Sequence, residues 1–106
     1  MLTDAFSPIE LGDVAAYAPY FEALPRRAAD YTFTNLWGWG MHYNLDWKTA
    51  HGLCWIRQRQ IGGPGECLWA PVGDWNAVDW ASLPELRPGT KLIRVPEPLC
   101  DLLAER

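Results

Sequence analysis

Two arginines on one predicted strand are the clearest candidates for a ligand-binding site in this sequence. Arg57 and Arg59 fall on the same side of segment 53–60 as Trp55, because alternate residues of a strand share a face. An arginine pair beside an indole can hold a carboxylate, a phosphate or the backbone of a tRNA. A solvated strand end explains the same pattern more simply, and we favour that interpretation.

Tryptophan is the second unusual feature, with seven in a chain of 106 residues. Trp37 is expected in the core, because it belongs to an apolar stripe at helical spacing. A unit of this size is not expected to bury all the others, and exposed aromatics in such number are typical of a contact surface. With the arginine pair, the predicted contact surface comprises Trp39, Trp47, Trp75, Trp80, Arg57 and Arg59.

The remaining reactive side chains lack the spacing of a catalytic or metal site. His42 and His51 would need a third metal ligand, so a surface or capping role is expected for both. Cys54 stands among apolar residues without a nearby His/Asp constellation, so a packed thiol is expected rather than a nucleophile. Three carboxylates could supply a general base, although solvated carboxylates are the simpler interpretation: Asp46, Asp74 and Asp79. The catalytic residues stay unknown, and no metal or cofactor is predicted.

Composition resembles that of ordinary soluble domains, with 49% hydrophobic and 21% charged residues. A net charge of −4 argues against a DNA-binding footprint and against a polybasic membrane anchor. No apolar run approaches the roughly 18 residues of a membrane span, and the first residues lack a signal-peptide pattern. Three cysteines without C-x-x-C spacing predict free thiols. A cytoplasmic domain is therefore expected.

Hydrophobic periodicity predicts an α/β (α+β) domain with the order β-α-α-β-β-β-α-β-α and a mainly antiparallel central sheet. The first helix contains Pro19, which predicts a kink or a split. The three central strands form a meander, with His51-Gly52 as the first turn and a glycine-rich second turn. Gly12-Asp13 is expected to cap the first helix. The expected ranges are 8–11 (strand), 14–24 and 30–44 (helices), 45–49, 53–60 and 67–70 (strands), 76–86 (helix), 91–95 (strand) and a last helix from 96.

Five segments, together with this order, carry a resemblance to a known family: Ser7–Asp13, Asp30–Trp39, His42–Leu45, His51–Ile56 and Ala70–Gly73. The chain resembles the N-terminal lobe of bacterial uncharacterised proteins akin to the C-terminal, aminoacyl-transferring domain of phosphatidylglycerol lysyltransferase. The order of elements resembles the first part of the GNAT acyltransferase fold without its final strand pair. In that family two GNAT-like lobes stand in tandem, and transfer chemistry is expected in the second.

The resemblance implies that residues 1–106 form a single GNAT-like lobe, the N-terminal part of a longer tandem-lobe protein. Such a lobe would be non-catalytic and would support the substrate cleft of an aminoacyl- or acyltransferase. A second lobe or a homodimer partner would cover its aromatics, and acyl-CoA or aminoacyl-tRNA would bind only the full-length protein. A stand-alone interaction or homodimerisation module is the alternative, and an autonomous acyl-CoA-dependent acyltransferase ranks last.

One glycine-rich segment imitates a cofactor loop. Gln60–Gly65 matches the letters Q-x-x-G-x-G, which in GNAT enzymes cradle the pyrophosphate of acyl-CoA. That role requires a strand-to-helix turn with free backbone N–H groups, whereas strand-like sequence follows here and Pro64 removes a donor. A hairpin turn is therefore expected. The resemblance instead places the pyrophosphate at 70–76, which offers one glycine, no basic residue and the repelling Asp74.

Overall fold

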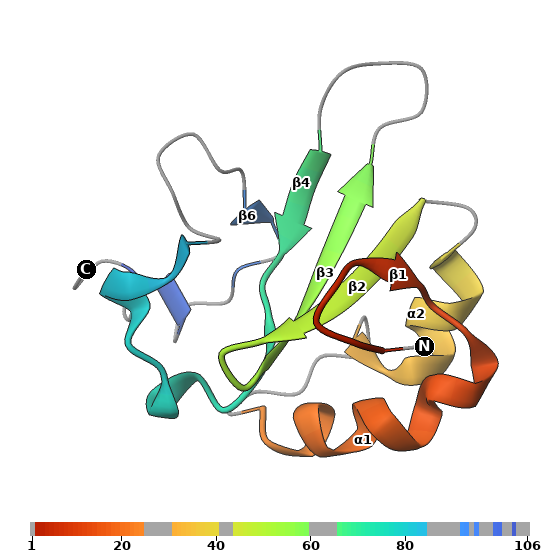
Figure 1. Cartoon of the computed structure of the whole chain (residues 1–106), viewed down its shortest axis with the longest axis horizontal. Coiled ribbons are helices and arrows are strands. Elements are labelled where there is room, and N and C mark those ends of the chain that lie inside the picture. The colour runs from red at the N-terminus through yellow and green to blue at the C-terminus, as the bar shows by residue number, and fades with distance from the viewer. Residues whose placement is uncertain are drawn as a thin grey trace.

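The computed structural model describes residues 2–24, 31–40, 44–59, 66–84, 92–93, 95, 99–100 and 103. Two helices lie against one side of a six-stranded, mostly antiparallel sheet, so the protein is a mixed α+β fold (Figure 1). The helices are α1 (Val14–Glu22) and α2 (Phe33–Gly40). The strands are β1 (Ser7–Pro8), β2 (Leu45–Ala50), β3 (Leu53–Arg59), β4 (Glu66–Trp69), β5 (Val72–Gly73) and β6 (Leu92–Ile93). Short 3-10 turns span Leu11–Asp13, Trp75–Ala77 and Trp80–Ser82.

The sheet confirms the predicted meander. Its strand order is β1-β2-β3-β4-β6, and among the described strand pairs only β4 with β6 is parallel. The β2–β3 hairpin turns through His51 and Gly52, both at positive φ, which matches the mirror-image turns that suit the twist of a hairpin. A two-residue turn fixes the register, so Ala50 faces Leu53 and Asp46 faces Arg57.

A β-bulge separates β4 from β5 along the same neighbour, β3. Three steps along β3, from Arg57 to Cys54, correspond to four steps along the opposite segment, from Leu68 to Val72. Pro71 lies at the extra residue and has no N–H to give the ladder. The amide of Ala70 donates instead to the carbonyl of Ile93, 2.9 Å away. The bulge therefore directs the chain from β3 towards β6, and β5 is a strand that the sequence did not predict.

The main core lies between the helices and the sheet face that carries Trp47 and Ile56, here called the helix face. Tyr17 of α1 stacks on Trp47, with ring centroids 5.2 Å apart, and Phe33 of α2 approaches Trp47 at 6.1 Å. The Tyr17 hydroxyl donates to the carbonyl of Tyr31 just before α2. These contacts hold both helices to β2, because one indole packs against a ring from each helix.

The predicted helix over 76–86 is wrong, because the structure places two short 3-10 turns in this segment. Asp74 and Asp79 each precede a turn, and their side chains accept from the amides of Asn76 and Ala81. Val78 between the turns is extended, at φ −113° and ψ 137°. Aspartate side chains offer the backbone local partners that compete with a continuous helix. Two such side chains five residues apart therefore divide the segment.

The other helices differ from expectation in detail. Pro19 lies inside α1, which runs without interruption from Val14 to Glu22, so the split that proline suggested is absent from this helix. A 3-10 turn over Leu11–Asp13 precedes it, and Asp13 is the N-cap of α1, which confirms the predicted cap. The last predicted helix lies largely outside the described residues.

Replacing Gly73 by alanine is expected to lower the free energy of unfolding by about 2 kcal/mol. Gly73 adopts φ 151°, and an added Cβ would lie 2.8 Å from Leu53 Cδ2 and 3.0 Å from the carbonyl oxygen of Gly52. Gly38→Ala is the matched control, because nothing lies within 4 Å of its added Cβ. In a helix interior that substitution should stabilise by about 1 kcal/mol. Urea unfolding of both variants tests the contrast, and equal effects would contradict it.

Candidate functional site

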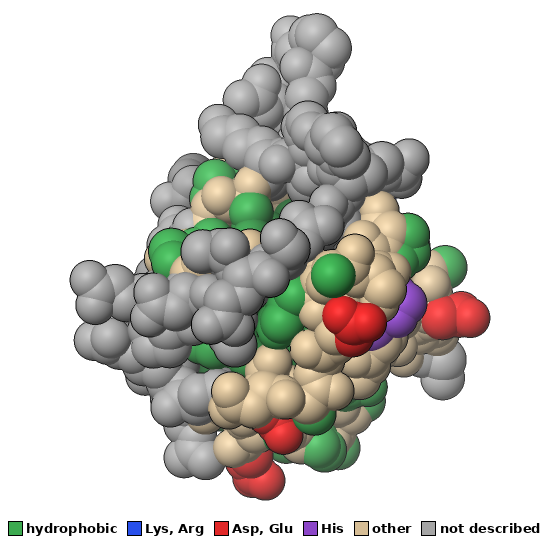
Figure 2. Space-filling view, turned by 90° about the vertical axis from the view of Figure 1, so that its left-hand side faces the viewer, with side chains coloured by type: hydrophobic (Ala, Val, Ile, Leu, Met, Phe, Trp, Pro, Cys, Tyr) green, Lys and Arg blue, Asp and Glu red, His purple; other side chains and the backbone are tan. Residues whose placement is uncertain are grey.

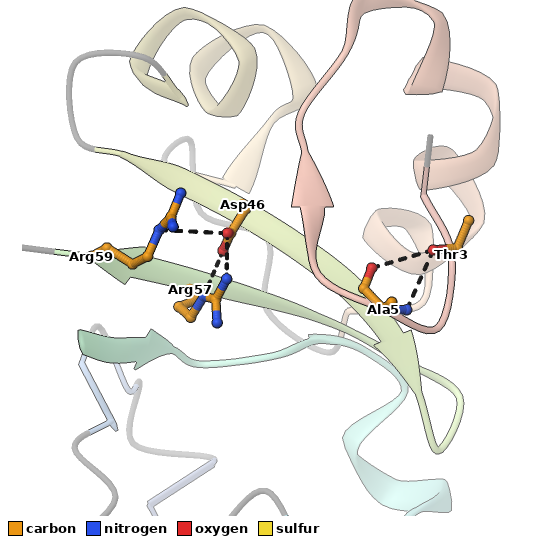
Figure 3. A network of polar contacts seen from close by, with 5 residues as sticks. All are labelled: Thr3, Ala5, Asp46, Arg57 and Arg59. Carbon is orange, nitrogen blue, oxygen red and sulfur yellow. Dashed lines mark hydrogen bonds and ion pairs between the residues drawn. The ribbon is translucent and has the colours of Figure 1, made fainter. Parts of the chain in front are cut away.

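The second sheet face carries a group of charged residues on neighbouring strands, and we call it the charged face. Asp46 and Arg57 face each other in the β2–β3 register, and Arg59 follows two residues along the same face (Figure 3). Lys48 lies two residues beyond Asp46, and Phe6 approaches from the segment before β1. The charged cluster is defined as Phe6, Asp46, Lys48, Arg57 and Arg59.

A buried carboxylate is the centre of the charged cluster. The Asp46 side chain is only 7% exposed, and the Arg57 fork donates to it from Nε at 2.8 Å and from the terminal nitrogen at 2.6 Å. Such two-point arginine–carboxylate pairs are strong and geometrically specific. Arg59 is held loosely, with its Nε 3.6 Å from an Asp46 oxygen and 57% of its side chain exposed. Asp46 is thus a neutralised structural carboxylate, which leaves it poorly suited to act as a solvated general base.

An aromatic ring covers the outer side of this ion pair. The Arg57 guanidinium carbon lies 4.0 Å from the centroid of the Phe6 ring, and the Lys48 ammonium lies 5.1 Å from it. Both distances suit cation–π attraction. Because Asp46 already engages the Arg57 fork, an external carboxylate or phosphate would have to displace Asp46 to use it. The predicted solvated strand end therefore describes Arg59 but not Arg57.

Three of the four tryptophans assigned to a contact surface are buried, so their predicted exposure is wrong. Trp47, Trp75 and Trp80 are at most 5% exposed. The Trp75 indole donates to the carbonyl of Pro71 at 2.7 Å, and the Trp80 indole donates to the carbonyl of Trp75 at 2.9 Å. The chain satisfies the indole N–H groups of Trp75 and Trp80 with its own carbonyls, so burial leaves neither of these two donors unpaired.

The prediction for α2 is wrong in the opposite sense. Trp37, expected in the core, is 47% exposed, whereas Leu36 is fully buried. Trp39 is partly buried and packs against the core. Neighbouring residues of a helix point about 100° apart, so one of Leu36 and Trp37 must turn away from the sheet. The smaller Leu36 occupies the space beneath α2.

The sequence-based interpretation of Cys54 as a packed thiol is confirmed. Cys54 is free, fully buried and on the helix face. Burial raises the pKa of its thiol far above the usual range. Burial likewise raises the pKa of the Tyr17 hydroxyl, and Cys54 and Tyr31 add smaller effects in the same direction. Neither group can supply a thiolate or a phenolate near neutral pH, so the described core offers no activated nucleophile at these positions.

Raising the pH above about 8.5 is expected to reduce the stability of the protein, because the unfolded Cys and Tyr side chains then begin to ionise. The folded state keeps the Cys54 and Tyr17 protons that the unfolded chain releases, so the free energy of unfolding falls as pH rises. Each group should contribute a slope approaching 1.4 kcal/mol per pH unit (about 2.3 RT) once its unfolded form has ionised. Urea midpoints between pH 8 and about 10.5 measure the slope. Cys54→Ala should remove its share, and an unchanged slope would contradict this account.

The segment that the resemblance assigns to a pyrophosphate uses its own hydrogen-bonding groups internally. Val72 and Gly73 pair with β3, and the amide of Ala70 donates to Ile93. The amide of Asn76 donates to the Asp74 side chain at 3.0 Å, and the amide of Ala77 donates to the Asp74 carbonyl at 3.3 Å. A phosphate at this segment would therefore meet occupied amides and the Asp74 carboxylate.

Figure 2 shows the face of the molecule on the side of β6 and of the 3-10 turns at 75–82. Among the described side chains in that view, hydrophobic, acidic and histidine groups are visible, and none is Lys or Arg. Pyrophosphate sites often use basic side chains. The described side chains visible on this face offer no such group.

The remaining predicted features are settled only in part. His51 is exposed at the β2–β3 turn, so its predicted surface role is confirmed. His42 and Gln60–Gly65 lie outside the described residues, although the strands that flank the latter form an antiparallel pair. In the described part of the chain, no three His, Cys, Asp or Glu side chains could together hold a metal ion. Among the described helices, none is long and apolar enough to cross a membrane.

Sequence reasoning missed Phe6 and Lys48, and it named Asp46 only as a possible general base rather than as the partner of Arg57. A signal for Asp46 was present, because the two-residue turn at His51-Gly52 aligns Asp46 with Arg57. Phe6 had no comparable signal, since nothing local connects it with residues more than 40 positions away. Comparisons with protein-family models, with curated proteins and with solved structures find no match to this chain.

Proposed function

We propose that the chain is a non-catalytic, acyltransferase-like lobe that supports the substrate cleft of a larger aminoacyl- or acyltransferase-like protein. One observation supports the non-catalytic part: at 70–76 the amides of Ala70 and Asn76 are hydrogen-bonded within the chain, β5 pairs with β3, and the Asp74 carboxylate stands beside them. The parallel pairing of β4 with β6 supports the ancestry, because the resemblance expects a crossover between these two strands, although 3-10 turns stand where it expects a helix.

Acetyl-CoA should leave the melting temperature of the purified chain unchanged. A ligand present at a hundred times its Kd would stabilise the folded state by about 2.7 kcal/mol, which shifts the melting temperature by several degrees. Thermal melting with about 1 mM acetyl-CoA would therefore reveal any site with a Kd near 10 µM. A saturable rise would contradict the proposal and would instead indicate an autonomous acyl-CoA-binding domain.

A stand-alone interaction module is the second candidate, and three exposed apolar side chains favour it. Leu11, Val14 and Trp37 are the large hydrophobic residues with high exposure in the described structure. Isolated exposed apolar residues are common, whereas a joint contact surface would make the chain associate. Light scattering separates the candidates: a dimer that Trp37→Lys converts to a monomer supports the module. A monomer at all concentrations favours the supporting lobe.

A further inference from the structure

Residues 2–8 run beside the outer edge of β2 with a bend at Asp4 and Ala5, and we call this segment the strap. Its last two residues are β1, which pairs antiparallel with β2 through Ser7 opposite Trp47 and Pro8 opposite Asp46. The strap crosses in front of the sheet before it reaches α1 (Figure 1). It occupies the side of β2 that β3 leaves unpaired.

The contacts of the strap show what the β2 edge recognises. The carbonyl of Thr3 accepts two hydrogen bonds from Thr49, from the amide at 2.7 Å and from the hydroxyl at 3.2 Å. The Phe6 ring lies against Lys48 and Arg57. The edge therefore binds backbone at two points, β1 and the Thr3 carbonyl, with the aromatic side chain of Phe6 placed against two cations. This is the chemistry of strand addition, in which main-chain bonds give affinity and side-chain sites give specificity.

Few backbone hydrogen bonds join the strap to β2, and the Asp13 side chain adds further bonds that fix its position. Its paired strand has only two residues, and one of them, Pro8, has no amide proton. The two oxygens of the buried Asp13 carboxylate accept from the amides of Leu2 and Glu10, each at 3.2 Å. Asp13 thus holds the first residue of the strap and the backbone that follows its last residue. Short edge elements with few bonds open at lower free energy than the central strands of a sheet.

We propose that the strap is exchangeable, and that the β2 edge which it leaves accepts the strap of a second copy of this chain. A second copy is the occupant that the structure itself describes, since it supplies the identical backbone, carbonyl and phenyl ring. Exchange replaces each internal contact by the same contact between copies, which is why swapping of a segment is a low-cost route to dimers. The inference is independent of the proposed acyltransferase-like function.

The test uses a fluorescein-labelled peptide of residues 1–10 and fluorescence polarisation with the whole chain. Two full-length variants loosen the internal strap and leave the β2 edge intact: Phe6→Ala and Asp13→Asn. Apparent affinity scales with the fraction of molecules whose edge is open, so both variants should bind the peptide about tenfold more tightly than the unmodified chain. A peptide carrying Phe6→Ala should lose most of this binding.

Three results would overturn the inference. One is the failure of either folded variant to bind the peptide, and another is equal binding of both peptides to all three chains. The third comes from hydrogen exchange on the unmodified chain and does not depend on the folding of any variant. The Thr49 amide, which the strap carbonyl protects, should exchange at a lower opening free energy than the central β2–β3 amides. Exchange of Thr49 only through global unfolding would show that the strap does not open.

Discussion

Replacing Trp47 by alanine is expected to lower the free energy of unfolding by about 4 kcal/mol, the typical cost of truncating a large buried aromatic side chain. Trp47 is fully buried and contacts a ring from each helix, Tyr17 of α1 and Phe33 of α2. The substitution therefore removes apolar burial, leaves a cavity and separates both helices from β2. Urea unfolding followed by far-UV circular dichroism measures the change.

Trp37→Ala is the matched control for the same chemical truncation. Trp37 lies on α2 with nearly half of its side chain exposed, so its loss should cost less than about 1 kcal/mol. A second comparison separates the ring from its polar group. The indole Nε1 of Trp47 is buried and finds no hydrogen-bond partner within the structure as described. Trp47→Phe removes that unpaired donor and retains a ring, so it should cost less than half as much as alanine. Equal costs at positions 47 and 37 would contradict the assigned burial.

The central hairpin could be predicted because local features determine it. Segments 45–50 and 53–59 alternate as strands do, and His51-Gly52 supplies a turn that tolerates positive φ. The 3-10 turns at 75–82 could not, because the segment also contains an apolar pattern of helical spacing. The apolar spacing favours a continuous helix, whereas the aspartate side chains favour short turns, and the structure contains the turns.

The burial of the tryptophans depended on tertiary contacts that no local pattern contains. Trp75 and Trp80 can be buried because their indoles donate to carbonyls of the chain, one in the bulge and one in the 3-10 turn over Trp75–Ala77. Trp37 is exposed because the stripe assigned to α2 was wider than the face that the sheet covers. Counting aromatic residues predicted an unusual surface, whereas the structure uses most of these residues in its interior.

The charged cluster was partly predictable for a related reason. The arginines were identified from alternation on one strand, and the strand pairing that brings Asp46 to Arg57 follows from the length of the turn. The strap is different, because Thr3 and Phe6 meet β2 across more than 40 residues of chain. Contacts of such sequence separation leave no periodic signal, and only the folded arrangement shows them.

Replacing Asp46 by alanine is expected to lower the free energy of unfolding by about 2 to 3 kcal/mol. The change leaves the Arg57 guanidinium without its two-point partner, and only 20% of the Arg57 side chain is exposed to water that could compensate. This partial exposure places the estimate below the about 3 to 5 kcal/mol typical of a broken, fully buried pair. Urea unfolding at neutral pH measures the effect.

Two further variants decide whether the effect belongs to the Asp46–Arg57 pair. Arg59→Ala is the matched control, because its looser and largely exposed ion pair with the same carboxylate should contribute less than about 1 kcal/mol. The double variant Asp46→Leu with Arg57→Leu removes both charges from the same site. It should cost less than Asp46→Ala alone, because an apolar pair leaves no unpaired buried charge. If the double variant instead costs the sum of its two single substitutions, Asp46 and Arg57 act independently, and their ion pair does not determine the stability of the charged face.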